Sequence, residues 1–595
     1  MKYLVLNKNY FKNKNKKEVL FYDWYSSEDL TLLNTKLLTQ LEKNLICQYH
    51  WDSRSKKFKD YKILAKLINR LLNEITIDIN KFHNLNYSRE YWKIILLPWL
   101  QQFTFLFFDR WEMVTKIPKN NLKFCIYNYN ESKDFNFIPE QYADINGQNK
   151  DFNYWIVSKI VEFKNNIKFI KKNASVKKYK FPEYPNFKKH KFSKIYEFVF
   201  KIFSKIFNCD FVMHGVGLSK LENIRLNLKL FQFPFFWVNP EYKNQNFDLE
   251  KRKKYFYKKS KKRDFEHFLK EMIYLTMPKA YLENYKSIKS AIDKSYWPKK
   301  SKIILTSYSY NFNEIFKIWT AEMIEKGSKY LILQHGGSMG LAAVNLGEDM
   351  QIDLSHKFLS WGWKNKGWGW DSKVKKIIPF NAFSLSMRKK FSFNASNKKI
   401  FVCITLPNKF SYGFSSYPRT NLDRLRKINS IKCLVNSLNH NLSDKIILRY
   451  RKKQEKRLLY EFPKKKIFNK RIEYDYANQP FDKIVSKGKL FIHDSNSTGF
   501  LETMFYNLPT VLILDKRCDI FRKTNEKIIK LLEKKKIIHY DANLAAKFIN
   551  ENFSNIEKWW FSKDIQLIRK RFCLKFVKEA DNPANELKNL LRKLS

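Results

Sequence analysis

Glycine, proline and cysteine are all scarce in this chain of 595 residues, which contains 14 Gly, 16 Pro and 7 Cys. So little glycine and proline excludes collagen-like and linker-rich chains and most all-β repeat architectures. The cysteines are odd in number and form no C-x-x-C pair; they are Cys47, Cys125, Cys209, Cys403, Cys433, Cys518 and Cys573. We therefore expect reduced thiols in a cytosolic protein, with neither a disulfide framework nor a structural zinc site.

No segment is long and apolar enough to be predicted as a membrane span. The most apolar window, residues 91–108, is interrupted by Lys93, Pro98 and two glutamines, whereas a spanning helix needs about 20 residues with few polar interruptions. The apolar stretch at the amino terminus covers only residues 3–6, which is too short for the hydrophobic region of a signal peptide. We interpret it as the first strand, followed by a basic turn and a second strand at 19–22.

Acidic residues are few, with 57 Asp and Glu against 114 Lys and Arg, a formal net charge of +57. Lysine far outnumbers arginine and is spread over the whole chain, and the residues of A/T-rich codons are abundant. We find no zinc-finger spacing, RNP-type motif or basic zipper, so no specific nucleic-acid module is predicted. We interpret most of the excess as compositional, with a general attraction to polyanions. The alternative is a genuine anionic partner: a membrane face, a lipid-linked phosphate or nucleic acid.

Apolar residues make up 44% and aromatic residues 17% of the chain, which is enough to fill packed cores and excludes a wholly disordered protein. The length suggests about four domains, or two to three large ones. Apolar spacings of three and four predict helices over 28–82 and 150–173. Residues 191–207 form a basic amphipathic pattern. We interpret it as a core-packed helix with a lysine face, the alternative being a helix on anionic lipid.

From about residue 300, short strands alternate with helices. The expected strands are 302–306, 330–333, 399–406, 445–450, 489–493 and 510–514. Strands of this length, rich in Ile, Leu and Val and separated by helices, predict an α/β fold with parallel sheets. We expect an N-terminal α/β domain over 1–363 with a helical insertion over about 28–290, a connection over 364–398, a second α/β domain over 399–540, and C-terminal helices over 541–595.

The segment KLFIHDSNSTGFLE brings polar residues from the end of a buried strand to the start of a helix. Ser497 or Thr498 can cap that helix, and its first-turn N–H groups and dipole suit an anion such as a phosphate. Glu502 lies one turn further on, where its carboxylate could accept hydrogen bonds from ribose hydroxyls. Asp494 and Ser495 precede the helix. The alternative is an ordinary strand–helix junction in which Ser and Thr only cap.

Another strand ends in Gln-His-Gly-Gly. Its His335 is a candidate general acid or base, or a hydrogen-bond donor to phosphate, because ligands bind at the carboxyl ends of strands in open α/β sheets. Gly336 and Gly337 permit close backbone approach, and Glu348 in the following loop is a second candidate for catalysis. Arg449, at the end of a later strand, is a candidate cation for phosphate or carboxylate. The alternative for each residue is a purely structural role.

The segment FHNLNYSREYWKIILLPWLQQFTFLFFDRW is predicted to form a helical hairpin broken near Pro98. Four of its polar residues could form an acceptor-binding wall; these are His83, Asn84, Arg89 and Arg110. The alternative is a pair of buried helices in which Asp109 and Arg110 form a satisfied polar link.

Three of these segments together carry a resemblance. FHNLNYSREYWKIILLPWL with FDRW, QHGGSMG with FLSWGW, and DSNSTGFLE with LPTVLIL resemble a family of transferases encoded among bacterial surface-polysaccharide genes. The opening VLFYDWY is also similar to that family's start, so the likeness covers nearly the whole chain. The second half more distantly resembles capsule Kdo transferases and teichoic-acid glycerophosphotransferases, through the QHG and Asp-Ser elements. Met339 and His356 depart from the pattern, which has an aromatic residue and an acid there.

The resemblance implies a GT-B-like fold of two Rossmann-like domains. It also implies a metal-independent glycosyltransferase with no cofactor, using a nucleotide-sugar co-substrate for which a CMP-linked donor is one candidate. By position, His335 would be catalytic or bind the donor phosphate, while Asp494, Ser495, Ser497, Thr498 and Glu502 would line the donor pocket. We expect a cytoplasmic protein that acts on a glycan or lipid-linked acceptor, with the anionic inner membrane face as a further candidate partner. The alternatives are a polyol-phosphate (CDP-glycerol-like) transferase and a non-catalytic basic protein that binds nucleic acid or membranes.

Overall fold

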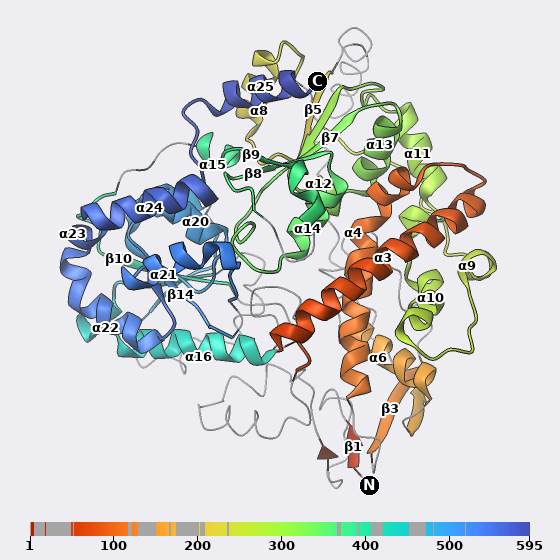
Figure 1. Cartoon of the computed structure of the whole chain (residues 1–595), viewed down its shortest axis with the longest axis horizontal. Coiled ribbons are helices and arrows are strands. Elements are labelled where there is room, and N and C mark those ends of the chain that lie inside the picture. Colours follow the sequence, from red (N-terminus) through yellow and green to blue (C-terminus); the bar gives the residue numbers. More distant parts are fainter. Residues whose placement is uncertain are drawn as a thin grey trace.

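Three parallel sheets and the helices around them make up the described part of the chain (Figure 1). The computed structural model describes residues 2–4, 18–19, 49–51, 53–116, 122–128, 150–165, 168–173, 202, 209–234, 237–365, 371–388, 391, 393–405, 421–450, 472–479, 481–517 and 519–595. Apart from residue 202, the amphipathic segment 191–207 lies outside these residues, as do residues 28–48 of the first predicted helix.

The six-stranded sheet of the C-terminal half has the order β12-β11-β10-β13-β14-β15. Its strands are β10 (Lys399–Ile404), β11 (Ile446–Tyr450), β12 (Glu473–Asp475), β13 (Gly488–His493), β14 (Thr510–Ile513) and β15 (Ile538–His539). Counted from β10, the order is 3-2-1-4-5-6, all parallel, as in doubly wound nucleotide-binding sheets. The direction of winding therefore reverses between β10 and β13.

Alternate residues of these strands enter separate cores on the two faces of the sheet. Val402 and Ile492 belong to one apolar cluster, whereas Phe401 and Phe491 belong to another. A parallel strand buried on both faces reads as a nearly continuous apolar run. That is why these segments were identifiable from their sequence.

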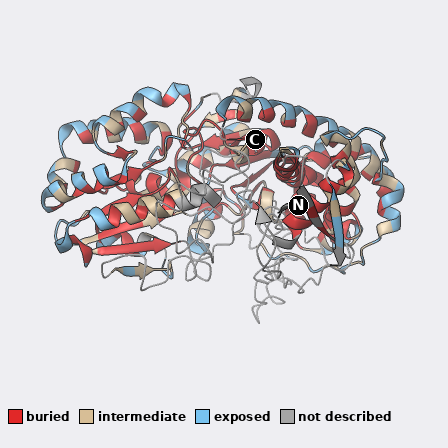
Figure 2. Cartoon of the chain, turned by 90° about the horizontal axis from the view of Figure 1, so that it is seen from below, coloured by how far each residue is buried: buried red, intermediate tan, exposed pale blue. Residues whose placement is uncertain are grey.

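The five-stranded sheet of the N-terminal half follows chain order, β5-β6-β7-β8-β9, and is also parallel. Its strands are β5 (Phe211–His214), β6 (Ile303–Thr306), β7 (Lys329–Leu333), β8 (Lys357–Ser360) and β9 (Ile377–Pro379). Two parallel sheets in two α/β units confirm the predicted GT-B-like fold class. Figure 2 shows two lobes, with buried residues toward the inside of each and exposed residues along the outer helices.

The third sheet has four strands in the order β2-β1-β3-β4. They are β1 (Lys2–Leu4), β2 (Glu18–Val19), β3 (Leu122–Asn128) and β4 (Phe169–Asn173). The predicted helix over 150–173 was therefore wrong beyond α6 (Lys150–Lys164). Asn165, with φ of 47°, follows the helix in the left-handed region, and residues 169–173 then pair in register with 124–128.

The helical insertion is centred on the hairpin of α3 (Arg54–His83) and α4 (Arg89–Thr115). The predicted break near Pro98 was wrong, because α4 continues through it as one helix of 27 residues. The turn lies earlier: Asn84 ends α3 in the left-handed conformation, and the Ser88 side chain caps α4. Nearly every residue of α4 is buried. We attribute the survival of the helix across Pro98 to packing on all its faces.

The remaining α-helices cover the sheets and the hairpin (Figure 1). They are α8 (Lys220–Lys229), α9 (Leu249–Phe256), α10 (Phe265–Thr276), α11 (Tyr285–Lys294), α12 (Ser309–Phe312), α13 (Glu314–Glu325), α14 (Leu346–Leu354), α15 (Phe383–Ser386), α16 (Asn421–Ser437), α17 (His440–Ser443), α19 (Phe481–Ile484), α20 (Thr498–Phe505), α21 (Glu526–Lys534), α22 (Ala542–Asn552), α23 (Ile556–Trp560), α24 (Lys563–Phe576) and α25 (Pro583–Leu594). Among the described residues, no helix has the length and apolar character needed to cross a membrane.

The chain ends by crossing back to the N-terminal unit. Leu587 and Leu591 of α25 share an apolar cluster with Leu333 and Leu359 of the five-stranded sheet. Just before α25, the backbone N–H of Lys578 donates to the carbonyl of Trp361 at 2.9 Å. The C-terminal helices predicted as one block thus pack on both units.

Replacing Leu587 with Ala should destabilise the N-terminal unit, because the side chain is fully buried. Large-to-small core substitutions of this kind cost about 2–5 kcal/mol. We expect the apparent melting temperature to fall by roughly 5 °C or more. The exposed Asn589→Ala on the same helix is the control and should melt like the wild type. Equal melting temperatures for the two variants would contradict the docking of α25.

Candidate functional site

The winding reversal brings polar groups together at the carboxyl ends of β10 and β13. The backbone N–H of Thr405, just after β10, donates to both carboxylate oxygens of Asp494, just after β13, at 3.0 Å each. Lys427 of α16 reaches the same point, its Nζ donating to the Asp494 carbonyl at 2.7 Å. Doubly wound sheets bind their ligands at this topological switch point, so the polar residues predicted at 494–498 lie where a ligand would bind.

The loop after β7 touches the start of α20 across the boundary between the two units. The backbone N–H of Gly337 donates to Thr498 Oγ1 at 3.0 Å. Because each loop follows the carboxyl end of its strand, the contact shows that the carboxyl edges of the two sheets face each other. The structure therefore brings the QHGG and DSNST segments together, as expected.

Glycine is required at 337 by this close approach. A Cβ atom there would lie 2.5 Å from the carbonyl carbon of Ser497 and 2.6 Å from the backbone nitrogen of Thr498. Both neighbours are backbone atoms and cannot rotate away. Gly336 is less constrained, since its Cβ would lie 3.1 Å from Thr498 Oγ1.

The first turn of α20 has no side-chain cap. Ser497 occupies the N-cap position but makes no capping hydrogen bond, and the Thr498 hydroxyl is engaged by Gly337. The prediction that one of these two side chains caps the helix was therefore wrong. First-turn N–H groups without a side-chain cap keep the positive end of the helix dipole available at this edge.

Several buried polar atoms at this edge have no hydrogen-bond partner among the described residues. They are Ser495 Oγ, both amide atoms of Asn496 and Oδ1 of Asp519. Unpartnered buried polar groups are costly and rare, so a cluster of them indicates a place for water or a ligand. Sequence reasoning missed Lys427, Asn496 and Asp519, although the charged run that follows β14 was a usable signal for Asp519.

Burial also changes the titration of groups near this edge. It raises the pKa of Asp519 to about 7, with the positive charge of Lys427 acting in the opposite direction. It raises the pKa of the Cys403 thiol to about 12. His493 has a structural role, because its Nε2 pairs with Thr503 Oγ1 at 3.1 Å and burial lowers its pKa to about 3.

Arg449 and Glu502 lie near the crevice but are engaged within the protein. The Arg449 guanidinium pairs with Asp475 and donates to the Gln479 carbonyl at 2.8 Å. Glu502 lies one turn into α20 as expected, and its carboxylate is 3.1 Å from Arg388 in the connection between the units. A ligand could engage either predicted group only by sharing or displacing these partners.

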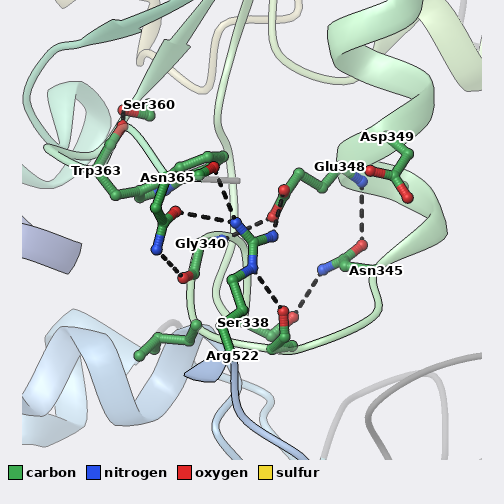
Figure 3. Close-up of polar contacts among 12 residues, drawn as sticks. Ser338, Gly340, Asn345, Glu348, Asp349, Ser360, Trp363, Asn365 and Arg522 are labelled. Carbon is green, nitrogen blue, oxygen red and sulfur yellow. Dashed lines mark hydrogen bonds and ion pairs between the residues drawn. The ribbon is translucent and has the colours of Figure 1, made fainter. Parts of the chain in front are cut away.

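Glu348, the second residue predicted to be catalytic, lies in a buried ion pair (Figure 3). One carboxylate oxygen pairs with Arg522 of the C-terminal unit, and the other accepts from the N–H of Gly340 at 2.7 Å. The side chain is 2% exposed. A carboxylate with both oxygens engaged and no solvent access is poorly placed to remove a proton from a substrate.

His335 is the exposed member of its loop, whereas Gln334 is buried and sets the loop's shape. The side-chain amide oxygen of Gln334 accepts from the backbone N–H of Trp361 at 2.9 Å and from the indole Nε1 of Trp363 at 2.8 Å. The side-chain amide nitrogen of Gln334 donates to the Gly336 carbonyl at 2.8 Å. Sequence reasoning missed Gln334 as a positioning residue. The neighbouring FLSWGW motif was the signal, because its tryptophans bind this amide.

The four predicted acceptor-side residues do not form one wall. His83 is buried, with Nε2 at 2.8 Å from the Tyr281 carbonyl, and burial lowers its pKa to about 4. Asn84 ends α3. Arg89 contacts two asparagines of α3, whereas Arg110 is fully buried against Asn153. The two arginines lie at opposite ends of α4, about 30 Å apart at 1.5 Å per residue, which is why they cannot share one small ligand.

The fold is that of a two-unit α/β protein, with the predicted donor-side residues at the switch point of its six-stranded sheet. The family model described as LIC12162 family transferase matches residues 2–591, so the chain belongs to this family of transferases. The predicted transferase family is confirmed at this level, and the distant likeness to Kdo and teichoic-acid enzymes stays a prediction.

Two solved structures match the chain at low similarity. A Staphylococcus aureus MnaA–UDP co-structure is 10% identical and covers 52% of this chain and 80% of its own, with a TM-score of 0.31. A Listeria monocytogenes structure assigned as a UDP-N-acetylglucosamine 2-epimerase is 8% identical, with 52% and 77% coverage and a TM-score of 0.30. No curated protein matches the chain.

Gly337→Ala should separate the two loops and abolish transferase activity, because the new methyl group meets backbone on the other unit. The control is Gly347→Ala, whose Cβ would meet no atom closer than 3.4 Å. We expect full activity in the control, and loss of about 1–3 kcal/mol of stability in Gly337→Ala from overpacking. Wild-type activity and melting in Gly337→Ala would contradict the contact.

The raised pKa of Asp519 predicts a pH-dependent stability. The folded chain holds this proton up to about pH 7, whereas an unfolded Asp loses it near pH 4. Stability from this group is therefore lost as pH rises between about 4 and 7. Asp519→Asn should melt progressively higher than the wild type across this range and keep the full gain at pH 8. Exposed Asp581→Asn should show no such trend, and neither would Asp519→Asn if the carboxyl titrated normally.

Proposed function

We propose that this protein is a glycosyltransferase of GT-B type that moves a sugar from a nucleotide donor to a glycan or lipid-linked acceptor in bacterial surface-polysaccharide synthesis. Membership of a transferase family supports the reaction class. The observation that carries the proposal is the contact of the QHGG loop with the start of α20. It brings the carboxyl edges of the two sheets together, and in the proposal donor and acceptor meet in a groove between them.

In this proposal the nucleotide occupies the crevice between β10 and β13. Its base and ribose would engage the buried Ser495, Asn496 and Asp519, whose unpartnered atoms need hydrogen bonds. The departing phosphate gains negative charge and needs compensation. Lys427 and the uncapped first turn of α20 are the groups at this edge that can supply it. Because Lys427 and this helix end can compensate the charge, the proposal includes catalysis without a metal ion.

His335 is the group that we propose to accept the proton of the acceptor hydroxyl. It is exposed and lies two residues from Gly337, and this supports a place for it beside the proposed groove. Glu348, the other candidate, is paired with Arg522. A positioned general base contributes about 10²–10⁴-fold to a rate.

His335→Ala should therefore lower kcat at least 10²-fold while leaving the melting temperature unchanged. The assay incubates the purified chain with nucleotide sugars and CDP-glycerol and measures released CMP, UMP, UDP and GDP. His440→Ala, which replaces an exposed histidine of α17, is the matched control and should keep full activity. Turnover of CDP-glycerol but of no nucleotide sugar would mean that the donor carries a polyol phosphate and not a sugar. Full activity of His335→Ala would overturn the role of this residue.

A further inference from the structure

A second histidine ends a strand of the N-terminal sheet, outside the site described above. His214 is the last residue of β5, and its Nδ1 lies 2.6 Å from Oγ of Ser309, the first residue of α12. Ser309 is 2% exposed and its N–H donates to Thr306 Oγ1 at 3.1 Å, so the serine is fixed. The bond to Ser309 sets the ring orientation and leaves Nε2 without a partner among the described residues.

The backbone around this pair is built for close packing. Gly215 has φ of 62°, and a Cβ there would collide with Ser309 Oγ. The Gly215 carbonyl accepts the N–H of Ser307 at 3.0 Å, which ties the end of β5 to the end of β6. The His-Ser pair is thus held by two neighbouring strand ends and not by a mobile loop.

Aromatic side chains surround the imidazole. Phe316 stacks on it with ring centroids 4.4 Å apart, and the Trp237 ring lies edge-on at 5.1 Å. Burial lowers the pKa of His214 to about 3, so the ring is neutral at physiological pH and a poor general base. A neutral, oriented imidazole can make one further hydrogen bond without adding charge.

Tyr308, next to Ser309, is 43% exposed, and its ring lies close to Gly215. No partner of its hydroxyl is found among the described residues. An aromatic face beside a few fixed polar groups is the usual make-up of a small-molecule site. The apolar face of a pyranose can pack on such a ring while its hydroxyl groups reach the imidazole.

The pair lies on the same edge of the sheet as His335. His214 is in register with Thr306, which is in register with Ile332 of β7, three residues before His335. Two strand spacings separate β5 from β7, about 10 Å, which is on the order of two sugar rings. Figure 1 shows α12, which begins at Ser309, in the central part of the view.

We propose that His214, Ser309 and Tyr308 form a binding site for a sugar unit of the acceptor, about 10 Å along the sheet edge from the reacting hydroxyl. That the bound sugar belongs to the acceptor rests on the proposed function. That the site binds a sugar at all rests on this geometry alone. His214 donates or accepts a hydrogen bond to a ring hydroxyl, Ser309 holds the imidazole, and Tyr308 packs against the ring.

The test uses the full chain and saturation-transfer NMR, with N-acetylglucosamine, glucose and galactose as the probes. His214→Phe keeps the aromatic volume and removes both ring nitrogens, and Tyr308→Ala removes a half-exposed ring. We expect either variant to lower the sugar signal at least fivefold. Tyr257→Ala is the matched control, because Tyr257 is 42% exposed, and it should keep the wild-type signal.

Binding of UDP, CMP and GDP is measured on the same samples to separate the two proposals. Unchanged sugar signals in both variants, or no sugar signal in the wild type, would overturn this site. Absence of nucleotide binding in every sample would overturn the donor chemistry proposed above, and a sugar signal that still depends on His214 would uphold the site. If His214→Phe does not fold, Tyr308→Ala decides the question.

Discussion

The geometry of the groove depends on the buried ion pair between Glu348 and Arg522. Arg522 also donates to the carbonyl of Ala342 at 2.9 Å, and Asn525 donates to the Gly340 carbonyl at 2.8 Å. These bonds anchor the loop after β7 to the C-terminal unit, in addition to the covalent connection (Figure 3). Removing one partner of a buried pair leaves an uncompensated charge and costs about 3–5 kcal/mol. The pair therefore fixes the two units relative to each other and holds Gly337 against α20.

That constraint has a consequence for the chemistry. With the loop anchored, the carboxyl edges of the two sheets stay together, and two of the charged groups predicted there are paired within the protein. Arg449 with Asp475 and Glu502 with Arg388 are examples. The atoms without partners belong to groups that are neutral or able to become neutral, such as the Asn496 amide and Oδ1 of Asp519. A site of this kind discriminates by hydrogen bonding, because a ligand lacking the matching group leaves buried polar atoms unpaired.

The high positive charge and the apolar window around Pro98 have separate physical explanations. The window became α4, a helix buried on nearly all faces at the centre of the helical insertion. Its Lys93 is accommodated by Asp353 at 3.3 Å. Other lysines pair with acids on the surface, as Lys399 does with Glu473 at 3.0 Å, and such exposed pairs contribute little to stability. The general attraction to polyanions expected from the composition stays a prediction.

The sequence by itself determined the local elements whose signals are local. Apolar runs such as 489–493 specified buried strands, and the polar residues after them indicated the crevice. It could not determine the strand order 3-2-1-4-5-6, which is what makes Asp494 a switch-point residue. Nor could it show that Glu348 and Arg449 are engaged in ion pairs, because their partners lie 174 and 26 positions away along the chain. It placed the helical break at Pro98, where packing on α4 overrides the lost hydrogen bond. Only the tertiary structure decided these points, because burial and pairing depend on neighbours that the fold brings together.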